Sequence, residues 1–204
     1  MLTMERETYH HGDLKEALIE AGIKILKEEG INALTLRSAA RAAGVSHSAP
    51  YAHFKDKQAL LAAISTRGFH RLFGELIQAG HKHAEDPRAL LLETGWAYVE
   101  FARSEPAFFK LMFSGILENE HSYPDFMKAV QLTFSKLVEV VETGQDANIL
   151  PAGKPDETAI AIWSLVHGFI SLYQEHQLPG QVLQRHTLKE LFSSAMSLML
   201  VTTP

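Results

Sequence analysis

The chain of 204 residues contains no cysteine. It can therefore form no disulfide bond, and no metal site in it can use thiolate ligands. Long hydrophobic runs are also missing, because the longest uncharged stretch, Thr158 to Gln174, includes a histidine and is too short to cross a bilayer. The polar segment from Met1 to His11 lacks the apolar core of a signal peptide. We therefore expect a cytoplasmic protein without a membrane partner.

An excess of positive charge, the usual sign of a nucleic-acid partner, is missing from the chain as a whole, whose net charge is −5. The charge is unevenly distributed, however. Residues 1–71 carry 10 Lys and Arg against 8 Asp and Glu, whereas residues 72–204 carry 9 against 16. This asymmetry fits an N-terminal part that binds DNA and a C-terminal part that does not.

The alternating pattern of β-strands is missing as well, and proline and glycine lie almost wholly between segments of helical periodicity. The sequence predicts an all-α fold of about nine helices, divided into a domain over 1–56 and a larger one over 57–204. Asp13 is expected to cap the first helix. The helix that begins at Lys57 is expected to link the two domains. The predicted helices cover about 13–29, 36–42, 47–53, 57–79, a fifth from 86, a sixth from 104, 123–143, 156–176 and 187–200.

The segment 35–61 has the layout of a helix-turn-helix, in which the second helix enters the DNA major groove. Thr35 precedes an apolar-periodic helix and is placed as its N-cap. Gly44 permits the backbone reversal, and Ser46 begins the next helix. Because a proline in a helix interior removes a hydrogen bond, we expect regular helix to begin late, with Pro50 near its first positions.

The polar residues of this segment have chemistry suited to DNA. His47, Ser48 and Ala49 lie on the first turn of the second helix, where side chains meet base edges. Tyr51 and His53 carry donors suited to phosphates, and Lys57 adds a point charge. An alternative is an alanine-rich helical hairpin that only packs against a core.

The segment from Leu34 to Leu61 resembles the DNA-binding domain of the tetracycline-repressor (TetR/AcrR) family of bacterial transcription regulators. The resemblance lies in Leu34-Thr35-x-Arg37, Ala39-Ala40, Ala43-Gly44-Val45-Ser46 and Tyr51-x-His53-Phe54-x-x-Lys57-x-x-Leu60. The opening Tyr9-His10-His11-Gly12-Asp13-Leu14 and the triplet Ala49-Pro50-Tyr51 are similar to one branch, whose C-terminal domain is marked by a Trp, a His and a Gly. Trp163, His167 and Gly168 match those marks. The predicted DNA contacts are Thr35, Arg37, Ser46, His47, Ser48, Ala49, Tyr51, His53 and Lys57.

The resemblance implies a C-terminal domain that binds an effector and forms a homodimer. Apolar side chains on more than one face of the eighth and ninth helices predict the dimer interface at Ile162, Phe169, Ile170, Tyr173, Leu188, Leu191, Phe192, Ala195 and Leu198. The eighth helix could instead be the centre of a monomeric core. Aromatic and methionine side chains predict a pocket for an apolar or aromatic molecule. Its predicted residues are Trp96, Tyr98, Phe101, Phe108, Phe109, Met112, Phe113, Phe126, Met127, Trp163 and His167, although most of them could instead be core residues.

We therefore expect a ligand-responsive homodimeric regulator, a repressor that a small molecule releases from a palindromic operator on double-stranded DNA and that is nucleoid-associated when bound. No enzyme motif or cofactor site is predicted. Glu118-x-x-His121 has the spacing of di-iron helix bundles, but such bundles need two motifs of this kind, so no metal is expected. The rival function is that of a helical interaction protein with an inactive DNA head.

Overall fold

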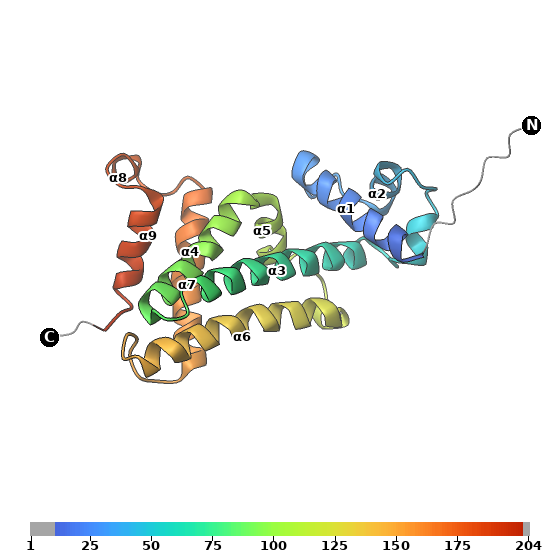
Figure 1. Cartoon of the computed structure of the whole chain (residues 1–204). Helices are drawn as coiled ribbons and strands as arrows, with labels where there is room; N and C mark the ends of the chain where they lie inside the picture. The colour runs from blue at the N-terminus through green and yellow to red at the C-terminus, as the bar shows by residue number, and fades with distance from the viewer. Residues whose placement is uncertain (1–10, 202–204) are drawn as a thin grey trace, which may run out of the picture.

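The computed structural model describes residues 11–201, which form an all-α structure as predicted (Figure 1). Within these residues the chain contains nine α-helices and two short 3-10 helices, η1 and η2. No helix of this described part is both long and apolar enough to cross a membrane. The helices are α1 His11–Glu29, α2 Leu36–Ala42, η1 Ala49–Ala52, α3 Lys57–Lys82, α4 Pro87–Ser104, α5 Pro106–Phe113, η2 Glu120–Ser122, α6 Pro124–Asp146, α7 Pro155–Gln174, α8 Gly180–Leu183 and α9 Leu188–Ser197.

Helix α3 runs through the middle of the molecule and joins its two parts (Figure 1). Its 26 residues make it about 39 Å long. Asp56 caps it by accepting a hydrogen bond from the Ala59 amide at 2.8 Å. The first turns of α3 pack against α1, and the rest of the helix packs against α4 and α6. We call α1, α2 and η1 the head, and α3 to α9 the body.

The predicted helices differ from the structure in several places, of which three have a clear origin. Helix α1 begins at His11, so position 13 lies inside the helix and is not its cap. The predicted third helix over 47–53 is only the single 3-10 turn of η1, because Pro50 has no amide hydrogen to continue an α-helical ladder. The short helix α8 was not predicted, since Pro179 and Gly180 indicated a break in the chain.

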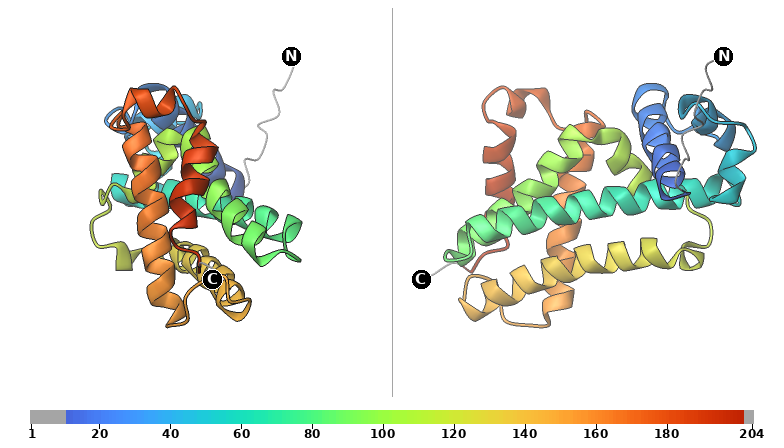
Figure 2. Two further views of the ribbon diagram at one scale, coloured as in Figure 1. Left: turned by 90° about the vertical axis from the view of Figure 1, so that its left-hand side faces the viewer. Right: turned by 45° about the vertical axis from the view of Figure 1, so that its right-hand side comes forward.

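Helix α9 packs against α4 and α7, and the side chain of Phe192 lies at this junction. A Cβ atom at Gly95 of α4 would lie 2.9 Å from Phe192 Cζ, so the glycine is what allows the ring to approach the helix. The Phe169 ring of α7 lies edge-on to the Phe192 ring, with the centroids 5.9 Å apart. Figure 2 (left) shows α7 and α9 side by side. Phe192 therefore belongs to the core of the single chain.

Candidate functional site

The head begins its helix-turn-helix with Thr35 as the N-cap of α2, as predicted, and Thr35 forms a capping box with Ser38. The Thr35 hydroxyl oxygen accepts a hydrogen bond from the Ser38 amide at 3.0 Å, and the Ser38 hydroxyl oxygen accepts one from the Thr35 amide at 2.8 Å. These two bonds satisfy amides that a helix start would otherwise leave without partners. The first turn of α2 is thereby fixed in place with Thr35 and Arg37 exposed to solvent.

The turn between α2 and η1 depends on Gly44, whose φ of +70° lies in the left-handed region. The Val45 amide donates to the Ala40 carbonyl at 3.0 Å, and the Gly44 amide donates to the Arg41 carbonyl at 3.2 Å. This pair of bonds is a Schellman motif, which ends α2 and turns the chain toward η1. The predicted base-reading residues therefore follow a defined reversal of the chain.

Of the predicted DNA-contacting residues, six are exposed and three are half-buried. Tyr51 is the most exposed aromatic residue among those described, at 56% of its full accessible area. The hydroxyls of Ser46 and Ser48 lie 3.2 Å apart and can share a hydrogen bond. Exposed residues are Thr35, Arg37, Ser46, His47, Ser48 and Tyr51, and half-buried ones are Ala49, His53 and Lys57.

Lys57 makes a contact that its sequence position did not predict. Its ammonium donates to the Ile31 carbonyl at 3.2 Å and so ties the start of α3 to the turn after α1. A lysine has three donors, so this bond leaves donors for a phosphate. Lys55, which was not among the predicted contacts, is exposed and lies 5.5 Å from the centre of the Tyr123 ring. The sequence feature that could have identified Lys55 as a DNA contact is its positive charge directly after the helix-turn-helix.

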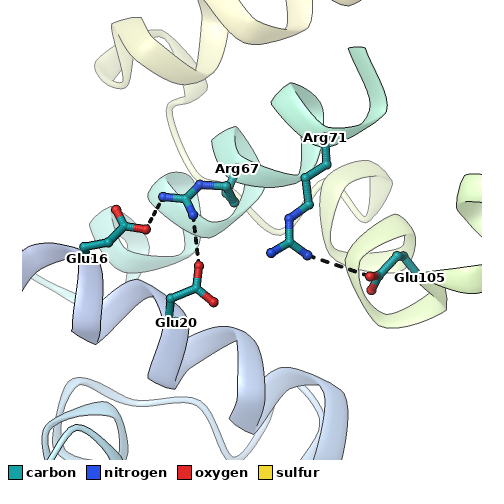
Figure 3. A network of polar contacts seen from close by, with 5 residues as sticks. All are labelled: Glu16, Glu20, Arg67, Arg71 and Glu105. Carbon is teal, nitrogen blue, oxygen red and sulfur yellow. Dashed lines mark hydrogen bonds and ion pairs between the residues drawn. The ribbon is translucent and has the colours of Figure 1, made fainter. Parts of the chain in front are cut away.

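Ion pairs join the head to the body along α3 (Figure 3). Arg67 of α3 pairs with both Glu16 and Glu20 of α1, at 2.9 Å in the case of Glu20. Because Glu16 and Glu20 are one helical turn apart, the guanidinium also offsets their mutual repulsion. Glu105, which precedes α5, lies 3.7 Å from the Arg71 guanidinium in the same network. The position of the head is therefore set partly by charges on α3 and at the start of α5.

The body contains a partly open cavity of about 840 Å³ between α3, α4, α5, α6 and α7. This volume falls in the range of sites that hold drug-sized molecules. Most of its wall is hydrocarbon and aromatic, as at Leu72 of α3 and Phe126 of α6. The wall thus includes residues of α3, the helix that also packs under the head.

The structure separates the predicted pocket residues into two groups. Tyr98, Met112, Phe113, Phe126, Met127 and Trp163 line the cavity. Trp96, Phe101, Phe108, Phe109 and His167 are not part of its wall. Trp96 instead packs on Phe192, with the ring centroids 5.6 Å apart, and Phe109 stacks on His167 at 5.2 Å. Aromatic composition alone does not distinguish the two faces of these helices, so both groups matched the same pattern.

Three predicted residues form a hydrogen-bonded chain beside the cavity. The Trp163 indole donates to the Tyr98 hydroxyl at 3.1 Å, and that hydroxyl lies 2.7 Å from His167 Nδ1. Burial raises the pKa of Tyr98 well above its usual range, so the phenol keeps its proton and can donate a hydrogen bond to Nδ1 when that nitrogen is unprotonated. Partial burial lowers the pKa of His167 below its usual value, which favours the neutral imidazole that can accept this bond.

Other cavity residues were not predicted, notably Phe69 and Leu72 of α3 and Thr94 and Leu91 of α4. The residues on α3 were indistinguishable in sequence from an ordinary core stripe. Thr94 carried a weak signal, because it is a hydroxyl residue on the apolar face formed with Leu91 and Tyr98 at helical spacing.

The predicted dimer residues fall into three groups by burial, and the three buried residues are corrected. Ile162, Ile170 and Phe192 are buried inside the single chain, so they are not surface residues of an interface. Leu198 is 83% exposed, which is the largest value for a large apolar side chain in the described residues. The half-buried remainder are Phe169, Tyr173, Leu188, Leu191 and Ala195. Helical periodicity identified both helices as apolar on several sides, but it did not tell which side faces the core.

Across residues 11–201 no three His, Asp or Glu side chains gather closely enough to hold a metal ion. Glu118, which lies two residues before η2, and His121, which lies in η2, are both exposed. The motif from Tyr9 to Leu14 lies partly outside the described residues. Of the two predicted domain parts, 1–56 and 57–204, the structure describes 11–56 and 57–201.

Comparison with known proteins places the chain among bacterial regulators. Residues 18–64 match the model of bacterial regulatory proteins of the tetR family, and residues 91–199 match the tetracyclin repressor-like C-terminal domain. The chain is 25% identical to the uncharacterized HTH-type transcriptional regulator YvkB of Bacillus subtilis over 74% of this chain and 78% of the relative. It is 25% identical to the regulator YobS of the same organism over 48% of this chain, and the match spans 51% of YobS. A solved structure from Rhodococcus sp. RHA1, of unknown function, superposes with a TM-score of 0.78 at 29% identity, covering 95% of this chain and 97% of that one.

Proposed function

The chain belongs to the tetR family of bacterial regulatory proteins and is a transcriptional regulator of that family; on this premise we propose that it is a homodimeric repressor released from its operator by a small molecule. The helix-turn-helix of the head binds the major groove of a near-palindromic site and blocks transcription. The predicted contacts Arg37, Tyr51 and Lys57 hold phosphates, and His47 and Ser48 read base edges.

One observation carries the ligand response: helix α3 belongs to both the head contact and the cavity wall. Its first turns pack against α1, whereas Phe69, Leu72 and Leu76 line the cavity. A molecule in the cavity that fits one position of α3 better than another shifts the balance between two head positions, and it can do so only by its differential affinity for them. Helices α3 and α5 also pack closely at Gly68, where an added Cβ atom would lie 2.5 Å from Met112 Sδ. A shift of α3 would therefore also move α5.

A dimer has a functional reason, because two recognition elements about 34 Å apart read two half-sites one DNA turn apart. Exposed apolar side chains on α7 and just after α9 support this proposal. Ile160 and Leu172 of α7 are about half exposed, at 52% and 49%, and Leu198 follows α9. Exposed apolar side chains of this kind are typical of an interface between subunits.

The proposal is tested first by selecting bound sequences from a random duplex pool with the full-length protein at near-physiological salt. We expect a two-fold symmetric motif. Analytical ultracentrifugation of the same protein is expected to give a dimer that Leu198→Glu dissociates, whereas Leu132→Glu on the exposed side of α6 leaves it intact. Weak, salt-sensitive binding with no enriched motif would instead favour an interaction protein with an inactive head.

A further inference from the structure

The cavity wall carries its charged side chains only where it is exposed to solvent. Its two charged residues, Glu120 and Lys128, are both exposed to solvent. The buried part of the wall carries hydroxyl, hydrocarbon and aromatic groups but no charged side chain among the described residues. A carboxylate or ammonium moved into such a site loses its hydration with no opposite charge to replace it. The cavity interior therefore disfavours a charged ligand group.

Thr94 of α4 supplies the buried polar atom that lacks a partner. The residue is 3% exposed and lines the cavity, and its Oγ1 makes no hydrogen bond with any residue of the described chain. Most buried hydroxyls in proteins are paired, and an unpaired one costs roughly 1–3 kcal/mol. Because an unpaired hydroxyl is unfavourable, the Thr94 hydroxyl is suited to form a hydrogen bond with a molecule bound in the cavity.

The other hydroxyls of the wall are already in use. Thr133 donates to the Ala129 carbonyl at 2.9 Å, as threonines in helices often do. Tyr98 receives the Trp163 indole hydrogen and lies 2.7 Å from His167 Nδ1. Thr94 is thus the buried wall hydroxyl that makes no hydrogen bond within the described residues.

We propose that the cavity takes a neutral, mainly hydrocarbon molecule that carries one uncharged hydrogen-bonding group, such as a ketone, alcohol or ester, and that Thr94 Oγ1 anchors this group. The aliphatic and aromatic wall holds the body of the molecule by burying its apolar surface. The hydroxyl of Thr94 donates to a carbonyl oxygen, or donates and accepts with an alcohol. This inference rests on the ligand site of the proposed function and names its chemical class.

The test compares 2-undecanone with undecanoate, which has the same chain length but carries a charge at pH 8. Binding is followed by the fluorescence of Trp163 in full-length protein carrying Trp96→Phe, so that the cavity holds the only tryptophan. The ketone is expected to bind at least about tenfold more tightly than the carboxylate, because the interior offers no counter-charge. Thr94→Val, which keeps the side-chain shape, is expected to weaken ketone binding by about threefold to tenfold, the worth of one hydrogen bond.

Thr133→Val is the matched control, because it also removes a buried wall hydroxyl but one that already has its partner. It is expected to change ketone affinity by less than about twofold. Thr94→Val removes an unpaired hydroxyl and is expected to melt no lower than the parent protein, so a loss of binding cannot be assigned to unfolding. Unchanged ketone affinity in Thr94→Val, a preference for undecanoate, or no saturable binding of the ketone would each overturn the proposal.

A DNA-binding measurement separates this inference from the proposed function. If 2-undecanone binds through Thr94 but leaves the affinity for the selected operator unchanged, the anchor is supported and the release mechanism is not. If another molecule releases the operator equally well from the parent and from Thr94→Val, the release mechanism stands and the anchor is wrong.

Discussion

Lys27 of α1 lies with its ammonium 2.6 Å from the carboxylate of Glu105, the residue that precedes α5. This contact joins the head to the helix that supplies Met112 and Phe113 to the cavity wall. A change in the cavity can therefore reach α1 through α5 as well as along α3. The pair is partly exposed, so its value to stability is modest, but its position makes it a candidate for coupling.

Glu105→Gln is expected to lower the free energy of unfolding by less than about 1 kcal/mol, because partly exposed ion pairs contribute little. It removes the partner of both Lys27 and Arg71, so it is expected to reduce the ratio of operator affinities measured without and with bound 2-undecanone. Fluorescence anisotropy of labelled operator gives both affinities.

The control for this coupling is Glu157→Gln, which breaks the Lys154–Glu157 pair within the first turns of α7. That pair has the same 2.6 Å separation but does not join the head to the body. An equal fall in the affinity ratio for both variants would show that Glu105 has no special part in transmission. A double-mutant cycle with Lys27→Ala isolates the pairwise contribution.

The contrast between the head and the cavity shows which features the sequence could predict. The hydrogen bonds at Thr35 and Gly44 join residues at most five positions apart, so the local sequence was enough to predict the N-cap and the turn. Ile162, Ile170 and Phe192 have the same apolar periodicity as surface interface residues, and only the packing of α4, α7 and α9 buries them. Lys57 was placed correctly at the start of its helix, but its partner Ile31 lies 26 positions away and no local pattern identifies it.

Gly68→Ala is expected to destabilise the protein by about 1–3 kcal/mol, the usual cost of overpacking. A Cβ atom there would lie 2.5 Å from Met112 Sδ and 2.8 Å from Phe108 Cδ1. Methionine can change rotamer, but Phe108 is fully buried, so α5 must shift. The higher helix propensity of alanine offsets at most about 1 kcal/mol of this loss in stability. Chemical denaturation measures the difference.

Gly74→Ala on the same helix is the matched control, since a Cβ atom at Gly74 meets no other atom within 4 Å. It is expected to be neutral or stabilising because it gains only the helix propensity. Equal stability of the two variants would mean that the contact between α3 and α5 is loose rather than close-packed.

His167 makes stability depend on pH in a defined direction. Burial lowers its pKa below 6.5 in the folded protein, so the unfolded chain binds more protons in the window just below that value. The stability that the neutral imidazole contributes is fully present above about pH 6.5 and is lost as the pH falls through the folded pKa. Protonation also removes the acceptor that Nδ1 offers to Tyr98.

His167→Asn keeps an acceptor near the Tyr98 hydroxyl but does not titrate. The melting temperature of this variant is expected to fall less between pH 7.5 and pH 5.5 than that of the parent protein. His121→Asn, at an exposed histidine, is expected to keep the full dependence on pH. Parallel pH profiles for His167→Asn and the parent would contradict the assignment of a neutral, hydrogen-bonded imidazole.

The DNA surface of the head is tested by separating phosphate contacts from base contacts. Arg37 is exposed on α2, so Arg37→Ala is expected to weaken binding to all duplexes alike and to reduce the slope of log affinity against log salt by about 1. Ser48→Ala is expected to change the preferred bases and leave that slope nearly unchanged. Lys110→Ala, at an exposed lysine of the body, is the control for a simple loss of charge.

Lys57 has one observed contact, with the Ile31 carbonyl, and one proposed contact, with a phosphate, so its variant is expected to differ from that of Arg37. Lys57→Ala removes a phosphate donor together with the bond to the Ile31 carbonyl, so it is expected to lower both DNA affinity and the melting temperature. Arg37→Ala is expected to lower affinity alone. Anisotropy at several salt concentrations, paired with thermal melts, distinguishes the two. If Lys57→Ala bound DNA as tightly as the parent at every salt concentration, Lys57 would only hold the head together, and Arg37 would remain to contact the phosphates.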